Sequence, residues 1–323
     1  MRRAFLPLLL LFSLLAVAAD LPKPALIVLS KGTNELVIVD PTAMKVLGRV
    51  PTGVGPHEVT VSSDGKTAFV GNYGDKTPGN SLSVIDLGSR TEKRIDLGPL
   101  RRPHGIAFKN NKVYFTSELA KAIATYDPVT GKVDWILGTG QMITHMLVLS
   151  SDGKKIFTSN IMGNSISAIE PAQVPGGWKL THIAVGKGPE AIDLSPDGSE
   201  VWTAHSQDGG VSIIDTSTYA VKQTLPALTK HSNRPKFTPD GKQVFISDAE
   251  GGEVVVIDSA TRKEIKRIKT GGVPLGILMV PDGSRAFVAL ADEGAAVAID
   301  LKTLEVRGKV TTGEGSDGMA WIP

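Results

Sequence analysis

The fold is decided by the stretch Pro189-Glu-Ala-Ile-Asp-Leu-Ser-Pro-Asp-Gly198 and the runs Val201-Trp-Thr-Ala204 and Val211-Ser-Ile-Ile-Asp215 that follow it. Asp-Gly between two short apolar runs is a strong signal for a tight β-hairpin. The third run is rich in β-branched residues and ends on an acid. We therefore interpret this stretch as three consecutive strands of one antiparallel sheet.

The same pattern recurs along the whole chain. The turn signal occurs six times, at residues 64–65, 110–111, 152–153, 197–198, 240–241 and 282–283. An apolar run that ends in an acid occurs seven times, at Asp40, Asp86, Asp127, Glu170, Asp215, Asp258 and Asp300. These acids recur in every repeat, which favours hydrogen bonds that close turns over a catalytic role. A fourth strand follows each acid, and a spacing of about 43 residues is typical of a β-propeller blade.

The sequence contains one turn signal fewer than it contains acids at strand ends, and the two ends of the chain explain the difference. Residues 25–29 have the pattern of a second strand without its first, and residues 318–322 that of a first strand without its second. Pairing the two closes a ring and leaves no open edge. We predict an all-β fold over residues 20–323: a single seven-bladed β-propeller with four antiparallel strands per blade, closed by the C-terminal strand.

The first 19 residues have the plan of a secretory signal peptide. Arg2-Arg3 precedes an apolar stretch, and Ala18-Ala19 supplies small residues at a cleavage site. The signal peptide predicts a bacterial periplasmic or secreted protein that has no membrane anchor after cleavage. We expect this protein to be a monomer. The chain has 35 Lys+Arg, 33 Asp+Glu and no cysteine. The near-zero net charge gives no argument for nucleic-acid binding, and disulfides and thiolate metal sites are excluded.

The repeats quoted above resemble the YVTN-type propeller repeat of bacterial periplasmic and surface proteins. The resemblance covers nearly all of residues 20–323 and implies the propeller fold. For function it implies a range, because related propellers include binding scaffolds, lactonases, lyases and cofactor-bearing subunits. The function therefore has to be argued from the site.

Strand direction places two rings of residues on one face of the disc, which we call the funnel face. The first ring is the start of each innermost strand: His57, His104, His145, Glu190, Lys236 or Pro235, Leu275 and Asp317. Three of the six histidines fall there, where random placement would give roughly 0.1. Imidazole and carboxylate groups on rigid strands suit Zn, Cu or Fe. We predict one divalent transition metal at His57, His104, His145 and Glu190. A purely structural role, with imidazoles bonded to loop carbonyls, is the alternative.

The second ring is the end of each second strand: Ser30, Asn72, Glu118, Asn160, His205, Asp248 and Leu290. Together the rings would form a polar funnel. We expect ligand contacts from Asn72, Asn160, His205, Asp248 and Asp317, and from Arg102 and Arg234 in loops that could hold an anionic group. Glu58 and Glu118 are the candidate acid/base residues. The long connection at residues 73–79 is a candidate lip over the funnel.

Two functions remain open from the sequence, and so does the question whether the protein is an enzyme. The first is a metal-dependent lyase, hydrolase or oxidoreductase acting on a small molecule in the funnel. The second is a non-catalytic propeller that binds a peptide, a glycan, a nucleic acid or a partner protein on the same face. The turns on the opposite face are short and uniform, so we expect that face to lack a pocket.

Overall fold

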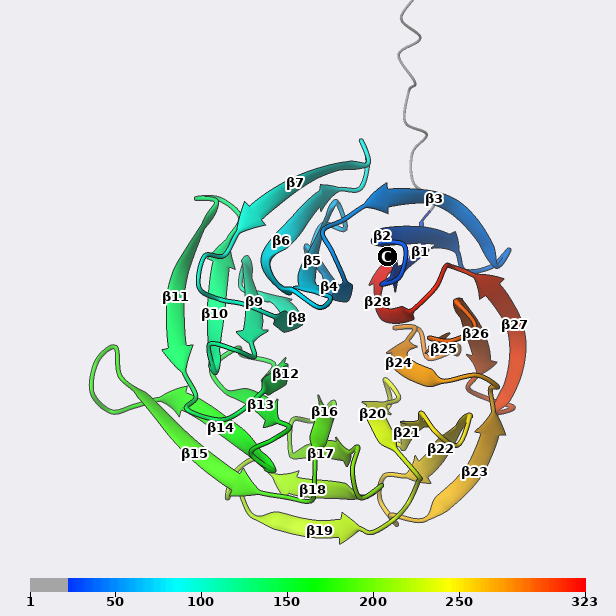
Figure 1. The fold of residues 1–323 in the computed structure, drawn as a ribbon. Helices are drawn as coiled ribbons and strands as arrows, with labels where there is room; N and C mark the ends of the chain where they lie inside the picture. Colours follow the sequence, from blue (N-terminus) through cyan, green and yellow to red (C-terminus); the bar gives the residue numbers. More distant parts are fainter. Residues whose placement is uncertain (1–22) are drawn as a thin grey trace, which may run out of the picture.

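The computed structural model describes residues 23–323 and shows a ring of seven four-stranded antiparallel sheets (Figure 1). The predicted seven-bladed β-propeller is confirmed. The predicted signal peptide lies outside the described residues. Within residues 23–323, no helix has the length and apolar character needed to cross a membrane.

Each blade consists of four strands that lie side by side, in order from the axis to the rim of the disc. The innermost strands of blades one to seven are β28 (Ser316–Ile322), β4 (Pro56–Val61), β8 (Pro103–Lys109), β12 (Thr144–Leu149), β16 (Pro189–Leu194), β20 (Ser232–Phe237) and β24 (Pro274–Met279). The second strands are β1 (Ala25–Ser30), β5 (Thr67–Gly74), β9 (Lys112–Ser117), β13 (Ile156–Asn160), β17 (Glu200–His205), β21 (Gln243–Asp248) and β25 (Arg285–Leu290). The third strands are β2 (Glu35–Asp40), β6 (Pro78–Asp86), β10 (Ala122–Asp127), β14 (Ser165–Pro171), β18 (Val211–Asp215), β22 (Glu253–Asp258) and β26 (Ala295–Asp300). The outer strands are β3 (Lys45–Pro51), β7 (Thr91–Asp96), β11 (Lys132–Gly138), β15 (Trp178–Ala184), β19 (Val221–Leu225), β23 (Glu264–Lys269) and β27 (Glu305–Thr311).

The ring closes inside blade one, as the sequence predicts. Strand β28 pairs antiparallel with β1, with Leu26 opposite Trp321 and Val28 opposite Met319. All six residues of β1 are buried, and the hydrophobic cluster of this blade combines Ile27 from one end of the chain with Ile322 from the other. The two ends therefore share one core.

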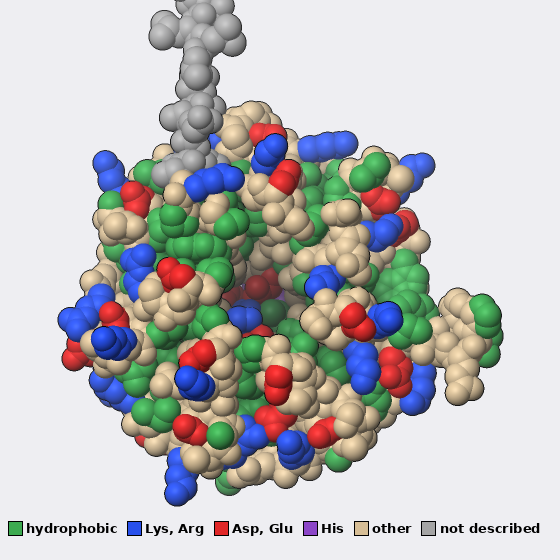
Figure 2. Space-filling model, turned by 180° about the vertical axis from the view of Figure 1, so that it is seen from behind, with side chains coloured by type: hydrophobic (Ala, Val, Ile, Leu, Met, Phe, Trp, Pro, Cys, Tyr) green, Lys and Arg blue, Asp and Glu red, His purple; other side chains and the backbone are tan. Residues whose placement is uncertain are grey.

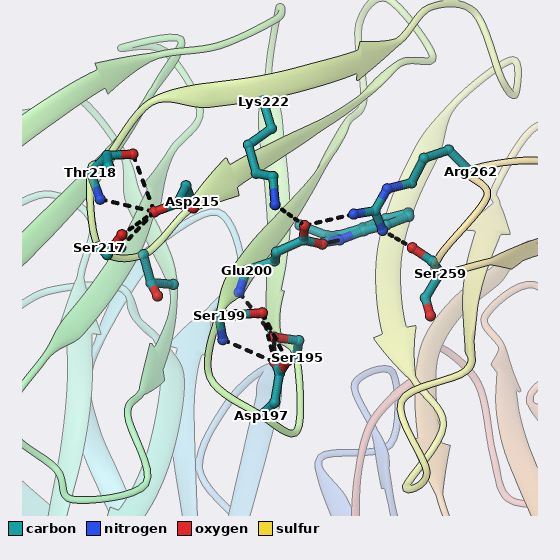
Figure 3. A network of polar contacts seen from close by, with 12 residues as sticks. Ser195, Asp197, Ser199, Glu200, Asp215, Ser217, Thr218, Lys222, Ser259 and Arg262 are labelled. Carbon is teal, nitrogen blue, oxygen red and sulfur yellow. Dashed lines mark hydrogen bonds and ion pairs between the residues drawn. The ribbon is translucent and has the colours of Figure 1, made fainter.

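The acids of the Asp-Gly turns and those at the ends of the third strands both close turns. In blade five, Asp197 accepts hydrogen bonds from the Ser195 hydroxyl at 2.6 Å and the Ser199 backbone N–H at 3.0 Å, and Asp215 accepts from the backbone N–H groups of Ser217 and Thr218 (Figure 3). Such local bonds satisfy backbone groups that the ladders leave free.

Blade three closes its first turn by another route. Asn110 and Asn111 both have positive φ, at 51° and 58°. Lys109 pairs directly with Lys112, which leaves only the two asparagines between the strands. Asparagine tolerates the left-handed region that a two-residue hairpin demands, so this turn needs no glycine.

A buried ion-pair network joins blades five and six around Glu200 (Figure 3). Its carboxylate accepts bonds from Lys222 at 2.8 Å, from Arg262 of the next blade at 2.6 Å and from the indole N–H of Trp202 at 3.0 Å. Burial acts to raise the pKa of Glu200, but the bonds and the two positive charges outweigh it, so the pKa is lowered from its ordinary value of 4.5.

We expect Glu200→Gln to destabilise the protein by about 1–3 kcal/mol at pH 7, because two cations lose their charged partner. A carboxyl with a depressed pKa in the folded state stabilises above its unfolded pKa and loses that contribution as pH falls through the folded value. The difference in melting temperature between wild type and variant should therefore shrink below about pH 4.5. Glu305→Gln, in an ion pair with both side chains 52% exposed, is the matched control and should change little.

Candidate metal and ligand site

A β-bulge near the start of each innermost strand builds the site. Pairing with the neighbouring strand steps from Pro56 to Val59 in β4 and from Pro103 to Ile106 in β8, so two residues in between leave the ladder. The other innermost strands show the same irregularity. Bulges re-aim side chains that a regular strand would alternate between two faces. The histidines stand directly after the first residue of their strands, within the bulge.

The bulge corrects the sequence prediction for blade six. Ser232 pairs with Asp248, and the next pair is Pro235 with Ile246. Asn233 therefore occupies the position of His57, and Arg234 that of Glu58. The predicted first-ring residues Lys236 or Pro235 are wrong, and Arg234 lies in β20 instead of a loop. The prediction from sequence spacing placed the blade-six residue too late in the strand, because two unpaired bulge residues shift the register.

The funnel-face end of the axial channel holds a cavity of about 340 Å³, which we call the histidine cavity. Its lining includes most of the predicted site residues: His57, His104, His145, Glu190, Glu118, Arg234 and Asp317. It also includes Lys31, Tyr73, Asn233 and five apolar residues. Blades that are far apart in sequence thus contribute to one cavity.

The three histidines lie in a row across neighbouring blades, with their rings tilted to one another. Ring centroids are 4.8 Å apart for His57 and His104, and 3.7 Å apart for His104 and His145. This approach requires glycine at position 105, where a Cβ atom would lie 2.7 Å from the carbonyl oxygen of His145. The Thr116 hydroxyl donates to that same carbonyl and fixes the backbone of His145.

His145 lies between two carboxylates. Its Nδ1 is 2.6 Å from Glu118 Oε1 and its Nε2 is 3.2 Å from Glu190 Oε1. Glu118 in turn accepts a hydrogen bond from the Tyr73 hydroxyl at 2.6 Å. Burial acts to lower the pKa of His145, but the bonds to Glu118 and Glu190 raise it to about 9. This histidine is therefore positively charged at neutral pH.

The other two histidines are neutral. Burial, with the nearby positive charge of Lys31, lowers the pKa of His57 to about 3. Burial and the charge of His145 hold the pKa of His104 well below 6.5. His57 has one long contact, 3.4 Å from Nδ1 to the carbonyl of Gly55. Among residues 23–323, His104 has no hydrogen-bond partner for its buried Nδ1.

Arg234 forms the floor of the histidine cavity. Its guanidinium reaches from β20 to Glu58 on β4, with Nη2 2.5 Å from Oε1, and lies 3.8 Å from Asp317. Asp317 also binds Lys31 at 2.9 Å. Burial, outweighing the charge of Arg234, raises the pKa of Glu58. This candidate acid/base residue therefore lies in an ion pair beneath the histidines and does not line their cavity.

The residues near the ends of the second strands form two sets: side chains buried inside their own blades, and side chains that line the histidine cavity. Glu118 belongs to the set that lines the cavity. In blades two to six, the first residues of the innermost strands pair with Asn72, Ser117, Asn160, His205 and Asp248, so Glu118 stands one residue later than predicted. Side chains alternate along a strand. Asn72, Asn160, His205 and Asp248 are buried in their own blades, whereas the residues just after the strand ends, such as Lys31 and Glu118, line the cavity.

The buried set holds loops in place. Asn72 accepts from the backbone N–H of Gly53 at 3.1 Å, and Asp248 accepts from Lys230 and His231 at 3.0 Å. Asn160 bonds the hydroxyls of Thr144 and Ser167, and His205 bonds Asp208. Ligand contact by these residues stays a prediction, as it does for Arg102, whose guanidinium lies 4.5 Å over the Tyr73 ring.

Sequence reasoning missed Tyr73, Lys31 and Asn233 as cavity residues. Tyr73 lies in β5 directly after the second-ring position Asn72, and Lys31 directly follows the second-ring position Ser30. Extending the search by one residue beyond each second-ring position would find both. Asn233 can be found only once the register of the bulge is known, because nothing in the sequence marks it as a cavity residue.

The opposite half of the channel also contains a cavity, which corrects the expectation that this face lacks one. We call it the second chamber. Its volume is about 480 Å³, and its walls come from all seven innermost strands. Seen from behind, the disc has a central hollow with charged side chains inside it and hydrophobic ones around it (Figure 2). Arg234 and Met146 line both cavities, so the Arg234–Glu58 ion pair lies between them.

Comparison with protein families gives one match, the cytochrome D1 heme domain, over residues 90–284. The matched segment is more than half of the chain. The chain belongs to the cytochrome D1 heme domain family. Comparison with curated proteins gave no match. The match bears out the sequence prediction of a bacterial β-propeller at this coarser level, and the YVTN resemblance stays a prediction.

Solved structures share the fold of this member of the cytochrome D1 family. Hydrazine synthase from Kuenenia stuttgartiensis matches with a TM-score of 0.69 and 19% identity, over 82% of this chain and 88% of the other. The periplasmic gluconolactonase PpgL of Pseudomonas aeruginosa matches with a TM-score of 0.76 and 16% identity, over 93% and 99%. The dihydro-heme d1 dehydrogenase NirN matches with a TM-score of 0.67 and 14% identity, over 92% and 74%. At these identities the likeness shows the fold alone.

The residues of the histidine cavity do not fit the heme that the cytochrome D1 family name implies. A planar macrocycle between two ring faces needs about 7 Å, twice the contact distance of carbon atoms. The histidine rings are 4.8 Å and 3.7 Å apart. The cavity of about 340 Å³ is at the lower end of small-molecule sites, and the Arg234–Glu58 ion pair closes its floor. The donor atoms suit a single ion instead: ligand atoms of His104, Glu118 and His145 lie within 4.8 Å of one another.

Proposed function

We propose that the histidine cavity binds one divalent transition metal ion, Zn, Cu or Fe, and presents it to a small molecule. The central proposed ligands are His104 and His145, whose ligand atoms lie within 4.8 Å of each other. His57 and Glu190 are the further ligands that the sequence predicts. The observation that carries this proposal is His104, which is 4% exposed, neutral, and has a buried ring nitrogen without a partner among the described residues. Buried polar groups are nearly always satisfied, and a neutral imidazole is a good metal ligand.

The charges around the cavity support a divalent cation. Arg234 is paired with Glu58, so three carboxylates of the lining, those of Glu118, Glu190 and Asp317, stand against one further cation, Lys31. With neutral imidazoles, two negative charges are therefore not compensated. The proton on His145 cancels one of them. A divalent ion would cancel both and would take the place of that proton at Nε2.

The surroundings of His145 support its role as a ligand. Glu118 accepts from Nδ1 and is itself held by Tyr73, which leaves Nε2 directed at Glu190. Metal-bound histidines commonly donate their other N–H to a carboxylate, which fixes the ring and raises its basicity. We therefore assign Glu118 as the residue that orients His145, in place of an acid/base role.

The chemistry supported best is Lewis-acid catalysis of a hydrolysis or an elimination. Both reactions would use the metal to polarise a bond of the small molecule or to activate a water. The hydrogen bonds of Glu118 with Tyr73 and with His145 Nδ1 would hold His145 in place as a ligand. A monomer in the periplasm or outside the cell is part of this proposal. The predicted signal peptide supports that location.

We expect the metal-depleted protein to bind one Co²⁺ or Zn²⁺ per chain, and His104→Ala to weaken this binding at least 100-fold. The reason is that an alanine removes a direct ligand from a site whose other donors are fixed by the blades. Glu118→Gln should weaken binding about 10–100-fold, because it disturbs only the orientation of His145. Isothermal titration calorimetry, with the visible spectrum of bound Co²⁺, measures both.

The control is His182→Ala, since His182 lies exposed on the outer strand β15. It should bind metal like the wild type. Binding below one ion per chain in the wild type, or equal losses in the His104 and His182 variants, would refute the metal site. An increase in α-helix or loss of the β-sheet circular dichroism in a variant would show misfolding, and His104→Gln then replaces His104→Ala.

A second candidate function is supported by apolar side chains on the funnel face. Val54, Leu119, Met142 and Met162 are 49–54% exposed, and all lie in loops of this face around blades two to four. Exposed apolar groups that gather around a cavity often mark a protein contact. We infer that a partner protein would dock there. Met142→Glu with Met162→Glu should then abolish cross-linking to the partner and leave metal binding unchanged; unchanged cross-linking would exclude this surface.

A further inference from the structure

The second chamber has the features of a separate binding site. It lies on the face opposite the histidine cavity, where innermost strands end, and the ion pair of Arg234 with Glu58 separates the two. Its volume of about 480 Å³ is within the range of small-molecule sites. Nothing in the proposed metal chemistry uses it.

Its walls combine polar groups with apolar side chains that are incompletely covered. Phe108, Val148, Leu194, Leu278 and Met319 line the chamber from five different blades, and each is only half-buried. Elsewhere the same kinds of side chain are packed inside the blades at less than 2% exposure. Apolar surface that faces water inside a concavity gains free energy when a ligand covers it.

The charges of the chamber differ from those of the histidine cavity. Its charged lining residues are Lys109, Arg234 and Lys236 against Glu58 and Asp193. Lys236 is paired with Asp193 at 2.8 Å and Arg234 with Glu58 at 2.5 Å. Lys109 is left, and within residues 23–323 its ammonium group has no ion-pair or hydrogen-bond partner. The chamber therefore carries one positive charge that is not compensated.

We propose that the second chamber binds an amphipathic organic anion, with its apolar body against the channel wall and its anionic group at Lys109. Lys109 is the last residue of β8, next to the Asn110-Asn111 turn, and so lies at the mouth of the chamber. The apolar side chains extend from there toward the Arg234–Glu58 floor. The ligand would enter tail first and keep its charged group near water. This inference does not depend on the metal site.

The test uses three probes that separate tail from charge: octanoate, octyltrimethylammonium and acetate. By isothermal titration calorimetry, we expect octanoate to bind the wild-type protein with one site per chain. Octyltrimethylammonium, which has the same tail and the opposite charge, should bind at least ten-fold more weakly. Acetate, which has no tail, should give no heat of binding at millimolar concentration.

Two variants locate the site. Lys109→Glu should weaken octanoate binding at least ten-fold, and Leu278→Gln should weaken it without reversing the preference for the anion. Lys187→Glu, the same charge reversal in an exposed loop of the funnel face, is the matched control and should bind like the wild type. Thermal melting of each variant verifies that it is folded.

The proposal is overturned by any of three results: no binding of octanoate, equal affinity for the anionic and cationic probes, or equal effects of Lys109→Glu and Lys187→Glu. Metal binding, measured on the same samples, reports independently on the histidine cavity. Neither Lys109 nor Leu278 lines that cavity. Failure of one proposal therefore leaves the other standing.

Discussion

Removal of the last six residues, 318–323, should abolish cooperative unfolding. The deletion takes away most of β28, including Met319, Ala320, Trp321 and Ile322, and exposes one edge and much of the core of blade one. Full burial of a side chain such as that of Ile322 stabilises by roughly 1.5–3 kcal/mol, and the deletion also uncovers the buried side chains of β1, such as Ile27. The total is comparable with the whole stability of a typical domain, about 5–15 kcal/mol.

The measurement is a thermal or urea unfolding curve followed by circular dichroism, with wild type and truncated chain at equal concentration. Deletion of residues 173–176, four exposed residues between β14 and β15, is the control and should unfold cooperatively. A truncated protein that melts like the wild type would show that the β1–β28 pairing does not hold the ring together.

Arg234→Met should destabilise the protein by about 3–5 kcal/mol, because it leaves the buried carboxylate of Glu58 without its partner. Asp317, 3.8 Å away, also loses a nearby positive charge. Methionine keeps most of the side-chain volume, so the loss reports on charge more than on packing.

A double variant makes the test specific. Glu58→Gln removes the charge that Arg234→Met leaves stranded, so the double variant should regain most of the stability lost by the single one. Urea denaturation at pH 7 measures all four proteins of this cycle. Equal destabilisation by the single and double variants would mean that the ion pair is not the source of the effect.

The fold could be predicted almost completely from the sequence because its signals are local and repeated. Asp-Gly turns and acids at strand ends act within a few residues, as Asp197 and Asp215 show, and seven copies of a weak pattern make it reliable. The closure by β28 followed from counting, since one strand at each end lacked a partner.

The site could be predicted only in part, because it depends on register and on contacts across the ring. His57, His104 and His145 were found by their equivalent positions, and the structure places them in one row. The Arg234–Glu58 ion pair spans 176 positions in sequence, and no local pattern indicates it. Glu118 was placed at the second-ring position that Ser117 occupies, and a shift of one residue reverses the direction of a strand side chain.

The first unpaired residue of each repeated bulge contributes to the binding site and not to the core of its blade. Residues in the bulges stand outside the ladder of hydrogen bonds, and the apolar residues that hold each blade lie further along the same strands. The bulges thus provide seven equivalent positions around one axis, which we call sockets. These positions carry histidine, carboxylate, amide and aliphatic side chains in different blades. Exchange of a residue in one socket changes what the axis can bind, while the blade that carries it keeps its core. A propeller built in this way can acquire a new ligand through a few substitutions and does not need a new fold.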